Sequence, residues 1–163
     1  WARFTCSQVS EKGEYLRDGV ILNWSHEIDL ALHLIGPGKV ATSYTDKHDG
    51  KDSLAIIVIK HDNGCVSTIQ IDYLLKPQVR GYTIQCGMTE IYCDIDEGSL
   101  LLKRHGQQPL IGSEMNFDEC YVREMEAFIA FASGGMMLGC TAVQALDVLD
   151  ICLRVREQAG LPI

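Results

Sequence analysis

The sequence has neither long apolar runs nor an excess of basic residues. Its longest nearly apolar run, Leu54–Ile59, is far shorter than the about 20 residues that a membrane-spanning helix needs. Its 14 Lys and Arg are outnumbered by 22 Asp and Glu, which gives a formal net charge of −8. Because nucleic acids are bound through clustered positive charge, we expect neither a membrane nor a nucleic acid as a partner.

The sequence also lacks the motifs of several enzyme classes. Neither G-x-G-x-x-G nor G-x-x-x-x-G-K-[ST] occurs, which excludes the usual nucleotide-binding loops from this chain, and G-x-S-x-G is absent. His26-Glu27 begins like the zinc motif H-E-x-x-H, but position 30 is leucine. His33 lies two helical turns, about 10 Å, beyond His26. One metal ion cannot bridge these two histidines without further ligands, so we expect no metal site.

No two of the seven cysteines have the C-x-x-C spacing of zinc sites and redox dithiols. Their number is odd, and several lie in apolar runs, as Cys152 does within residues 148–153. This pattern favours buried, reduced thiols in a reducing compartment. Residues 1–7 lack the apolar segment of a signal peptide, so we expect a cytoplasmic protein. The first residue is not methionine, which is compatible with a processed form or with a piece of a longer protein.

What is present is the composition of one globular domain. Hydrophobic residues make up 47% and charged residues 22%, a balance that excludes disorder and allows a substantial core. An early helix is predicted over residues 25–35, because Ile28, Leu32 and Ile35 recur at helical spacing. The Gly-Pro-Gly sequence at 36–38 ends it.

Two further helices are expected at the end of the sequence. The first covers residues 118–132 and stops at Gly134-Gly135, and the second begins with a Thr141-x-x-Gln144 capping box and runs to about Gln158. Both carry apolar side chains at helical spacing, and those of the second helix are predicted to face the core. These are Tyr121, Met125, Phe128 and Ala132 in the first helix, and Leu146, Leu149 and Leu153 in the second.

The middle of the sequence predicts strands joined by hairpins. Asp62-Asn63-Gly64 is a strong turn signal, because Asn-Gly accepts a positive φ at both central positions. Consecutive hairpins flanked by helices indicate an α+β fold: an open, mainly antiparallel sheet with helices packed on one face. The strands are predicted over residues 2–9, 40–45, 53–61, 64–74, 80–86, 90–94 and 99–103.

Alternation within residues 65–73 assigns side chains to the two faces of the sheet. One set is predicted to face the core and the other a partner subunit or solvent. The first set is Cys65, Ile69, Ile71 and Tyr73, and the second is Thr68, Gln70 and Asp72.

The candidate functional residues lie at the start of the early helix. The apolar stretch Val20–Leu22 is expected to enter the core and to deliver Asn23, Trp24, Ser25 and His26 to the helix N-terminus. Polar side chains beside free helix amides suit a ligand with hydroxyl or anionic groups, and histidine can act as an acid or a base. The alternative is structural: Asn23 or Ser25 caps the helix, and His26 is an ordinary polar residue.

Three more polar residues have two possible roles. Lys76 precedes Pro77, which ends the preceding strand, so Lys76 either is a solvated charge or lines a pocket. Tyr15 and Arg17 lie in a loop predicted over residues 10–19, where they either cover a pocket at the helix start or belong to the surface.

The stretch Gly19-Val-Ile-Leu-Asn-Trp-Ser-His-Glu-Ile-Asp29 resembles the second-domain signature of the Gfo/Idh/MocA oxidoreductases, the relatives of glucose–fructose oxidoreductase and inositol dehydrogenase. Three later segments resemble family segments in the same order. Ile71-Asp-Tyr-Leu-Leu-Lys-Pro77 is similar to a strand ending Asp-Tyr-Leu-x-Arg-Pro. Tyr121-x-x-Glu-Met-x-x-Phe128 resembles the next helix, and residues 141–163, ending Gly-Leu-Pro-Ile, resemble the closing helix and its end.

The resemblance implies that residues 1–163 form one substrate-binding and oligomerisation domain with a dihydrodipicolinate reductase-like C-terminal fold. An N-terminal Rossmann domain, absent from this chain, would bind NAD or NADP. The full-length protein would be an NAD(P)-dependent oxidoreductase acting on a secondary alcohol of a sugar, inositol or related polyol, and the isolated chain would be inactive. The open sheet face would join subunits into a homodimer or homotetramer.

Within this resemblance, His26 takes the position of the family histidine that assists proton transfer. Asn23 stands where the family has aspartate, and an amide cannot take up a proton, although it can orient a hydroxyl. The family's catalytic lysine, in a Glu-Lys-Pro of the first domain, has no counterpart here. Leu75-Lys76-Pro77 is not that motif, because leucine precedes Lys76 and the segment is expected in the sheet.

The remaining candidates, Tyr15, Arg17, Trp24 and Lys76, would position the substrate. A second hypothesis is a non-catalytic ligand-binding or dimerisation module of the same fold, which the asparagine at position 23 favours. A third is an α+β domain with no active site.

Overall fold

The computed structural model describes residues 1–7, 18–104, 106–108, 110–112 and 116–163. Tyr15, Arg17 and the last two residues of the strand predicted over 2–9 lie outside the described residues. The strands are β1 (Ala2–Ser7), β2 (Gly38–His48), β3 (Lys51–His61), β4 (Val66–Asp72), β5 (Val79–Cys86), β6 (Thr89–Asp94), β7 (Ser99–Arg104) and β8 (Leu110–Ile111). The helices are α1 (Val20–Asn23), α2 (His26–Ile35), α3 (Phe117–Ala132) and α4 (Ala142–Gln158).

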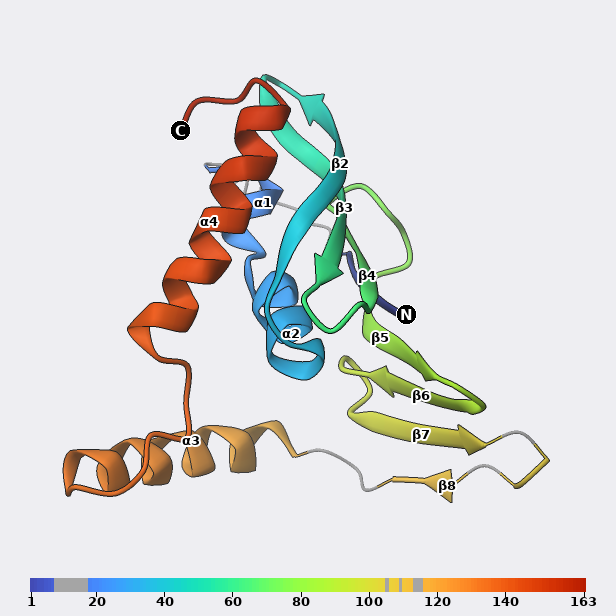
Figure 1. The fold of residues 1–163 in the computed structure, drawn as a ribbon, viewed down its shortest axis with the longest axis vertical. Helices are drawn as coiled ribbons and strands as arrows, with labels where there is room; N and C mark the ends of the chain where they lie inside the picture. The colour runs from blue at the N-terminus through green and yellow to red at the C-terminus, as the bar shows by residue number, and fades with distance from the viewer. Residues whose placement is uncertain (8–17, 105, 109, 113–115) are drawn as a thin grey trace.

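Within the described residues, the strands form one open sheet in the order β2-β3-β4-β1-β5-β6-β7-β8 (Figure 1). All neighbouring pairs are antiparallel except β1 and β4, which run parallel. The predicted α+β fold is therefore confirmed. Because β1 and β4 end at the same edge, with Ser7 opposite Asp72 and Val79 of β5 beside them, three chain segments meet there.

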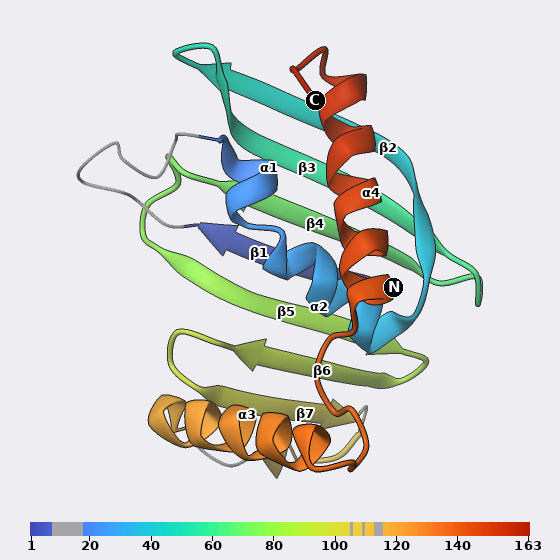
Figure 2. The same ribbon diagram turned by 90° about the vertical axis from the view of Figure 1, so that its left-hand side faces the viewer.

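Helices α1, α2 and α4 cover the β1–β4 part of the sheet on one face (Figure 2). The predicted alternation in β4 is confirmed at Ile69, Ile71 and Tyr73, which are buried against these helices. Thr68, Gln70 and Asp72 are half-exposed on the open face. The remaining core residues include Phe4, Val20, Ile21, Ile28, Ala55, Ile57, Ile59, Ile151 and Val155.

Helix α4 packs through a different face from the predicted one. Leu146 and Leu149 are exposed and Leu153 is half-buried, whereas Ile151, Cys152 and Val155 lie in the core. The physical reason is Arg156, the residue after Val155. Its guanidinium pairs with the buried Asp52 of β3, so the helix face that contains Val155 and Arg156 is turned inward.

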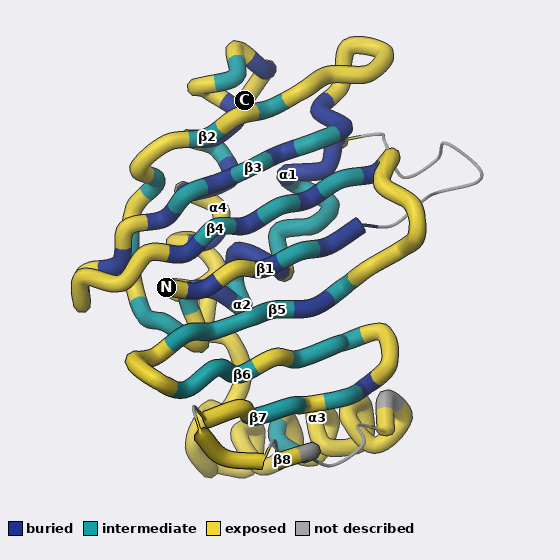
Figure 3. Tube along the Cα trace, turned by 90° about the vertical axis from the view of Figure 1, so that its right-hand side faces the viewer, coloured by how far each residue is buried: buried dark blue, intermediate teal, exposed yellow. Residues whose placement is uncertain are grey.

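The apolar stripe predicted on α3 is present, but it does not face the core. Tyr121 is 71% exposed, Met125 58% and Phe128 64%, and Ala132 is exposed as well. Helix α3 lies on the same side of the sheet as α4, near β7, but among its described side chains only Ala127 is even half-buried (Figures 2 and 3). Periodicity shows that a helix has an apolar face, but not that its own chain covers that face.

The hairpin between β3 and β4 forms as predicted, with a different turn. Only Gly64 has a positive φ, 86°, and its N–H donates to the carbonyl of His61 over 2.9 Å. This geometry is a type I turn followed by a left-handed glycine, in place of the expected pair of positive φ values. Cys65, predicted to face the core, is exposed at this turn because the strand begins only at Val66.

The predicted helix ends are confirmed. Thr141 and Gln144 form both bonds of the capping box that starts α4. Gly134, at φ 92°, follows α3, and Gly160, at φ 62°, follows α4. All seven cysteines are described and unpaired, but only Cys6 and Cys152 are buried, so the expected burial of the thiols applies to these two.

Candidate functional site

The candidate site is the corner between α1 and α2, at the sheet edge where β1 and β4 end and β5 begins. Asn23 is the last residue of α1, Trp24 follows it, and His26 is the first residue of α2. The chain enters the corner through Gly19, whose φ is 79°. A Cβ at this position would lie 1.9 Å from Oδ1 of Asp52, so both the backbone conformation and the space require glycine.

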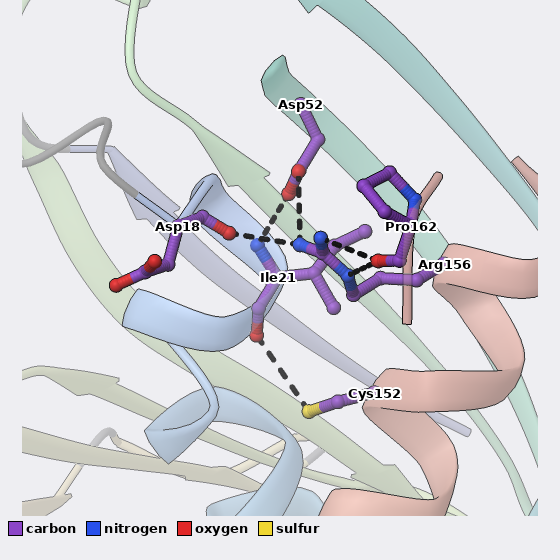
Figure 4. A network of polar contacts seen from close by, with 6 residues as sticks. All are labelled: Asp18, Ile21, Asp52, Cys152, Arg156 and Pro162. Carbon is purple, nitrogen blue, oxygen red and sulfur yellow. Dashed lines mark hydrogen bonds and ion pairs between the residues drawn. The ribbon is translucent and has the colours of Figure 1, made fainter. Parts of the chain in front are cut away.

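A buried polar network anchors the start of the corner (Figure 4). The Ile21 N–H donates to Asp52 Oδ2 over 2.8 Å, and Arg156 Nη1 lies 3.4 Å from Asp52 Oδ1 and 2.8 Å from the Asp18 carbonyl. The same guanidinium donates to the Pro162 carbonyl through Nε and Nη2. Arg156 therefore ties α4 and the C-terminal residues to β3 and to the residues that lead into Asn23 and His26.

The far end of α2 is fixed by side chains of the β3–β4 hairpin. Asn63 Nδ2 donates to the Ile35 carbonyl over 2.7 Å. The buried His61 ring contacts the Gly36 carbonyl through Nδ1 at 2.6 Å and Ser67 Oγ through Nε2 at 2.9 Å. Since carbonyls at a helix C-terminus lack intrahelical partners, these contacts satisfy them and hold the helix in place.

The structure brings three predicted residues together and leaves a fourth on the neighbouring segment. Asn23 and Trp24 are half-buried, and His26 is exposed at the start of α2. Lys76 is exposed on the connection between β4 and β5. The structure contradicts one part of the capping alternative: Ser25 occupies the N-cap position of α2 but makes no capping hydrogen bond through its side chain. Asn23 is the last residue of α1.

Two side chains that were not predicted complete the corner. Tyr73 meets Trp24 edge to face, with ring centroids 6.3 Å apart, and Arg80 places Cζ 5.8 Å from the centroid of the Trp24 ring. Both follow from alternation. Arg80 shares a face of β5 with Tyr82 and Ile84, which pack against the core. The alternation of the strand therefore marks Arg80, in the sequence, as a charged residue on the inward-facing side.

A third residue, Glu27, was also missed, and it is fully buried. Its Oε1 lies 2.8 Å from Arg80 Nε. Burial raises the pKa of Glu27, while the charges of Arg80 and His26 oppose that rise. The signal that could have identified Glu27 is its position four residues before Ala31, because residues at this spacing share one side of a helix, here the buried side of α2.

The thiol of Cys6 faces the same carboxyl group. Burial and the nearby Glu27 raise the pKa of Cys6 to about 12, so the thiol keeps its proton at neutral pH. A protonated, buried thiol is neither a good nucleophile nor a metal ligand.

Chemically, the corner can move a proton and hold a hydroxyl. The exposed imidazole of His26 can give or take a proton, and the amide of Asn23 can donate and accept hydrogen bonds. The ring of Trp24 offers an apolar face beside them, and Arg80 adds a fixed positive charge.

The described residues do not fit a metal or a dinucleotide. No group of three metal-ligating side chains occurs among them. Glycines at 134 and 135 follow a helix, and no described strand leads through a glycine-rich turn into a helix as a dinucleotide phosphate needs. Among the described helices, none is long and apolar enough to cross a membrane.

A shallow depression of about 580 Å³ lies elsewhere, along the β5–β6 hairpin and β7. Its lining residues include Met88, Glu90 and Arg104, and it contains none of the corner residues. Its walls carry no buried titratable group, so the corner remains the better candidate for chemistry.

No family model matches the sequence, and no curated protein matches it significantly. Solved structures do match. UDP-N-acetylglucosamine 3-dehydrogenase from Acidithiobacillus ferrooxidans has a TM-score of 0.82 at 19% identity, over 96% of this chain and 52% of that one. Levoglucosan dehydrogenase in complex with NADH and levoglucosan has a TM-score of 0.80 at 14% identity, over 96% of this chain and 56% of that one.

A third match is an oxidoreductase from Agrobacterium radiobacter in complex with NAD+, L-tartaric acid and magnesium, with a TM-score of 0.79 at 18% identity, over 98% of this chain and 54% of that one. These dehydrogenase and oxidoreductase structures share the α+β fold of this chain over about half of their length. At these identities the likeness is one of fold, and it confirms the resemblance at that level. The chain spans about half the length of the solved structures that it matches.

Proposed function

We propose that this chain is the substrate-binding domain of an NAD(P)-dependent oxidoreductase that acts on a secondary alcohol of a sugar, inositol or related polyol. The observation that carries the proposal is the corner itself. It presents an imidazole, an amide and an aromatic ring together, on a fold shared with sugar dehydrogenases. An N-terminal Rossmann domain outside this chain would bind NAD or NADP and supply the hydride chemistry.

The part of this chain would be the proton and the orientation of the substrate. His26 would take the hydroxyl proton during oxidation and return it during reduction. Asn23 would orient the hydroxyl, and Trp24 would pack against the apolar face of the sugar ring. Lys76, together with Tyr15 and Arg17, would contact substrate hydroxyls from the surrounding segments.

The open face of the sheet would be the assembly surface of a homodimer or homotetramer. Thr68, Gln70 and Asp72 lie on this face beside apolar side chains of β3, including the half-buried Ile56 and Val58. A stable interface would bury about 1,200 Å² or more in total. We also propose a cytoplasmic location, on the grounds given for the first residues and the thiols.

The alternative is a non-catalytic ligand-binding or dimerisation module. Asn23 favours it, because an amide cannot replace a carboxylate as a proton acceptor. The variant Asn23→Asp separates the two proposals. In a protein that has lost its chemistry, the restored carboxylate should raise turnover. In a working enzyme that relies on the amide, the same change should lower turnover.

The test is the turnover of the intact protein with NAD and NADP on a panel of sugars, inositols and alditols. His26→Ala should lower kcat about 10²- to 10⁴-fold, the usual contribution of a general acid or base. His33→Ala, which removes an exposed histidine from the same helix, should leave kcat unchanged and serves as the control. No turnover by the intact protein, together with retained polyol binding, would favour the non-catalytic module. Turnover by residues 1–163 alone would contradict the missing-domain proposal.

A further inference from the structure

Arg80 and Glu27 form an ion pair whose two ends lie at different depths. Arg80 Nε is 2.8 Å from Glu27 Oε1. The Glu27 side chain is 0% exposed and the Arg80 side chain 31% exposed. Glu27 therefore lies beneath the corner, and Arg80 reaches from it to the surface.

Among the described residues, Glu27 is the one hydrogen-bonding partner of the Arg80 guanidinium. A guanidinium carries five N–H donors, of which Glu27 takes the one on Nε. Among the described residues, no other hydrogen bond or ion pair involves the guanidinium of Arg80. The donors on Nη1 and Nη2 lie in the parallel pair geometry that matches the two oxygens of a carboxylate or phosphoryl group.

The guanidinium is also held in position before any ligand arrives. Glu27 fixes it from one side, and Trp24 lies against it with 5.8 Å between Cζ and the ring centroid. The helix that carries Glu27 is fixed in turn by Asn63 and His61. A preorganised side chain loses little conformational entropy on binding, so more of the interaction energy appears as affinity.

The two residues that hold Arg80 are the sequence neighbours of the proposed reacting residues. Trp24 follows Asn23, and Glu27 follows His26. Through its contact with the Trp24 ring and its bond to Glu27, Arg80 belongs to the same corner as Asn23 and His26.

We propose that Arg80 binds an oxyanion of the substrate, a carboxylate or a phosphoryl group, and that the substrates of this site are acidic sugars or polyols. The inference rests on the proposed function and narrows its substrate class. Glu27 then has a positioning role: it orients the guanidinium from below and prevents it from turning into solvent.

The test is equilibrium binding to the intact protein, measured by calorimetry with matched ligands. The pairs are D-gluconate with D-glucitol and D-glucose 6-phosphate with D-glucose, and the first pair reports a carboxylate while the second reports a phosphoryl group. The anionic member of at least one pair should bind about tenfold more tightly, since a charge-assisted hydrogen bond contributes that much or more. The advantage should shrink at high salt.

Variants locate the source of this preference. Arg80→Gln should remove the difference in affinity between the anionic and the uncharged member of a pair, and Arg80→Lys should restore part of it. Arg104→Gln, which removes an exposed cation far from the corner, should retain the difference. Loss of the preference in Lys76→Gln but not in Arg80→Gln would overturn the inference.

Because Arg80→Gln leaves the buried Glu27 without its partner, the double variant Glu27→Gln/Arg80→Gln is the folded control. Its two amides can still bond to each other, and it should show no preference for the anion. The outcomes for the two proposals are distinct. Equal binding of both members, weakened in both by His26→Ala, leaves the polyol site standing and overturns the role of Arg80. Binding of no member of either pair contradicts both proposals.

Discussion

The two ends of the sheet differ in how far the chain covers its own apolar residues. At the β2–β4 end, α1, α2 and α4 close over the sheet, and Ile57, Ile69 and Ile28 are fully buried. At the β6–β8 end, no described residue of β6 or β7 is buried, although Gly98 in the turn between them is (Figure 3). Helix α3 exposes apolar side chains along its length. The first end has its own core and the second does not.

This difference supports the packed end as the location of the proposed function. The candidate corner belongs to the packed end, where buried contacts from β3, α4 and the hairpin hold it. A site that must place a proton acceptor and an anion-binding side chain within ångströms needs such support. At the β6–β8 end, the strands and α3 form with amphipathic patterns, but no described residues cover their apolar faces.

The largest effect should come from the buried ion pair of the packed end. Asp52→Ala removes the partner of Arg156 and the acceptor of the Ile21 N–H, and Asp52 and Arg156 are 2% and 11% exposed. We expect a loss of about 3–5 kcal/mol in the free energy of unfolding, because an unpaired buried charge remains. Urea denaturation of the two proteins measures it.

The matched control is an ion pair of the outer end. Lys103 and Glu90 pair across β6 and β7 at 3.4 Å with half or more of the lysine and a third of the glutamate exposed. Glu90→Ala should change the free energy of unfolding by less than about 1 kcal/mol. Equal losses in the two variants would show that the two ends are equally packed.

A second effect, on pH dependence, should come from the buried thiol of α4. Burial raises the pKa of Cys152 from 9.0 to about 11. Since the unfolded thiol ionises first, this group's contribution to stability is complete below pH 9 and is lost as the pH rises from 9 to 11. The slope is about 1 kcal/mol per pH unit within that window.

The Cys152→Ala variant should lose less stability than the unchanged protein between pH 9 and pH 11, as followed by urea denaturation at each pH. Ionisation of exposed tyrosines and lysines is common to both proteins and cancels in the comparison. Cys120→Ala, which removes a thiol from the exposed surface of α3, is the control for the substitution itself. Parallel stability curves for the Cys152→Ala variant and the unchanged protein would contradict the assigned pKa.

The smallest effect should come from removing one methyl group at each end. Ile57 is 0% exposed and Ile129 is 57% exposed. Ile57→Val should lower the free energy of unfolding by about 1 kcal/mol, because a buried methyl group is lost. Ile129→Val should change it by less than about 0.5 kcal/mol, as for other surface positions. A comparable loss at position 129 would mean that α3 is buried in solution.

The sequence was informative wherever a local rule decides the structure. Alternation in β4 and the Thr141–Gln144 capping box depend on neighbouring residues alone, and both were predicted. The location of Asn23, Trp24 and His26 at a helix start was also predicted, from a resemblance and an apolar stretch. The capping role of Ser25 failed, since a preceding short helix places its backbone in a helical conformation.

The rest of the site depended on pairing between distant segments. Arg80 lies 53 residues from Glu27, and its role follows from the register of β1 with β5, where Cys6 lies opposite Arg80. The parallel pairing of β1 with β4 forms the sheet edge at which the corner lies. No local sequence pattern indicates which distant strand will be a parallel partner.

The sequence by itself determined the α+β class, the order of the described elements other than α1 and β8, the ends of the last two helices and the candidate residues near the start of α2. These follow from periodicity, turn chemistry and capping, which act over a few residues. Only the tertiary structure decided which helix faces are covered, and it alone paired Arg156 with Asp52 and Arg80 with Glu27. Burial and charge pairing depend on which distant segments come into contact, and periodicity does not specify those contacts.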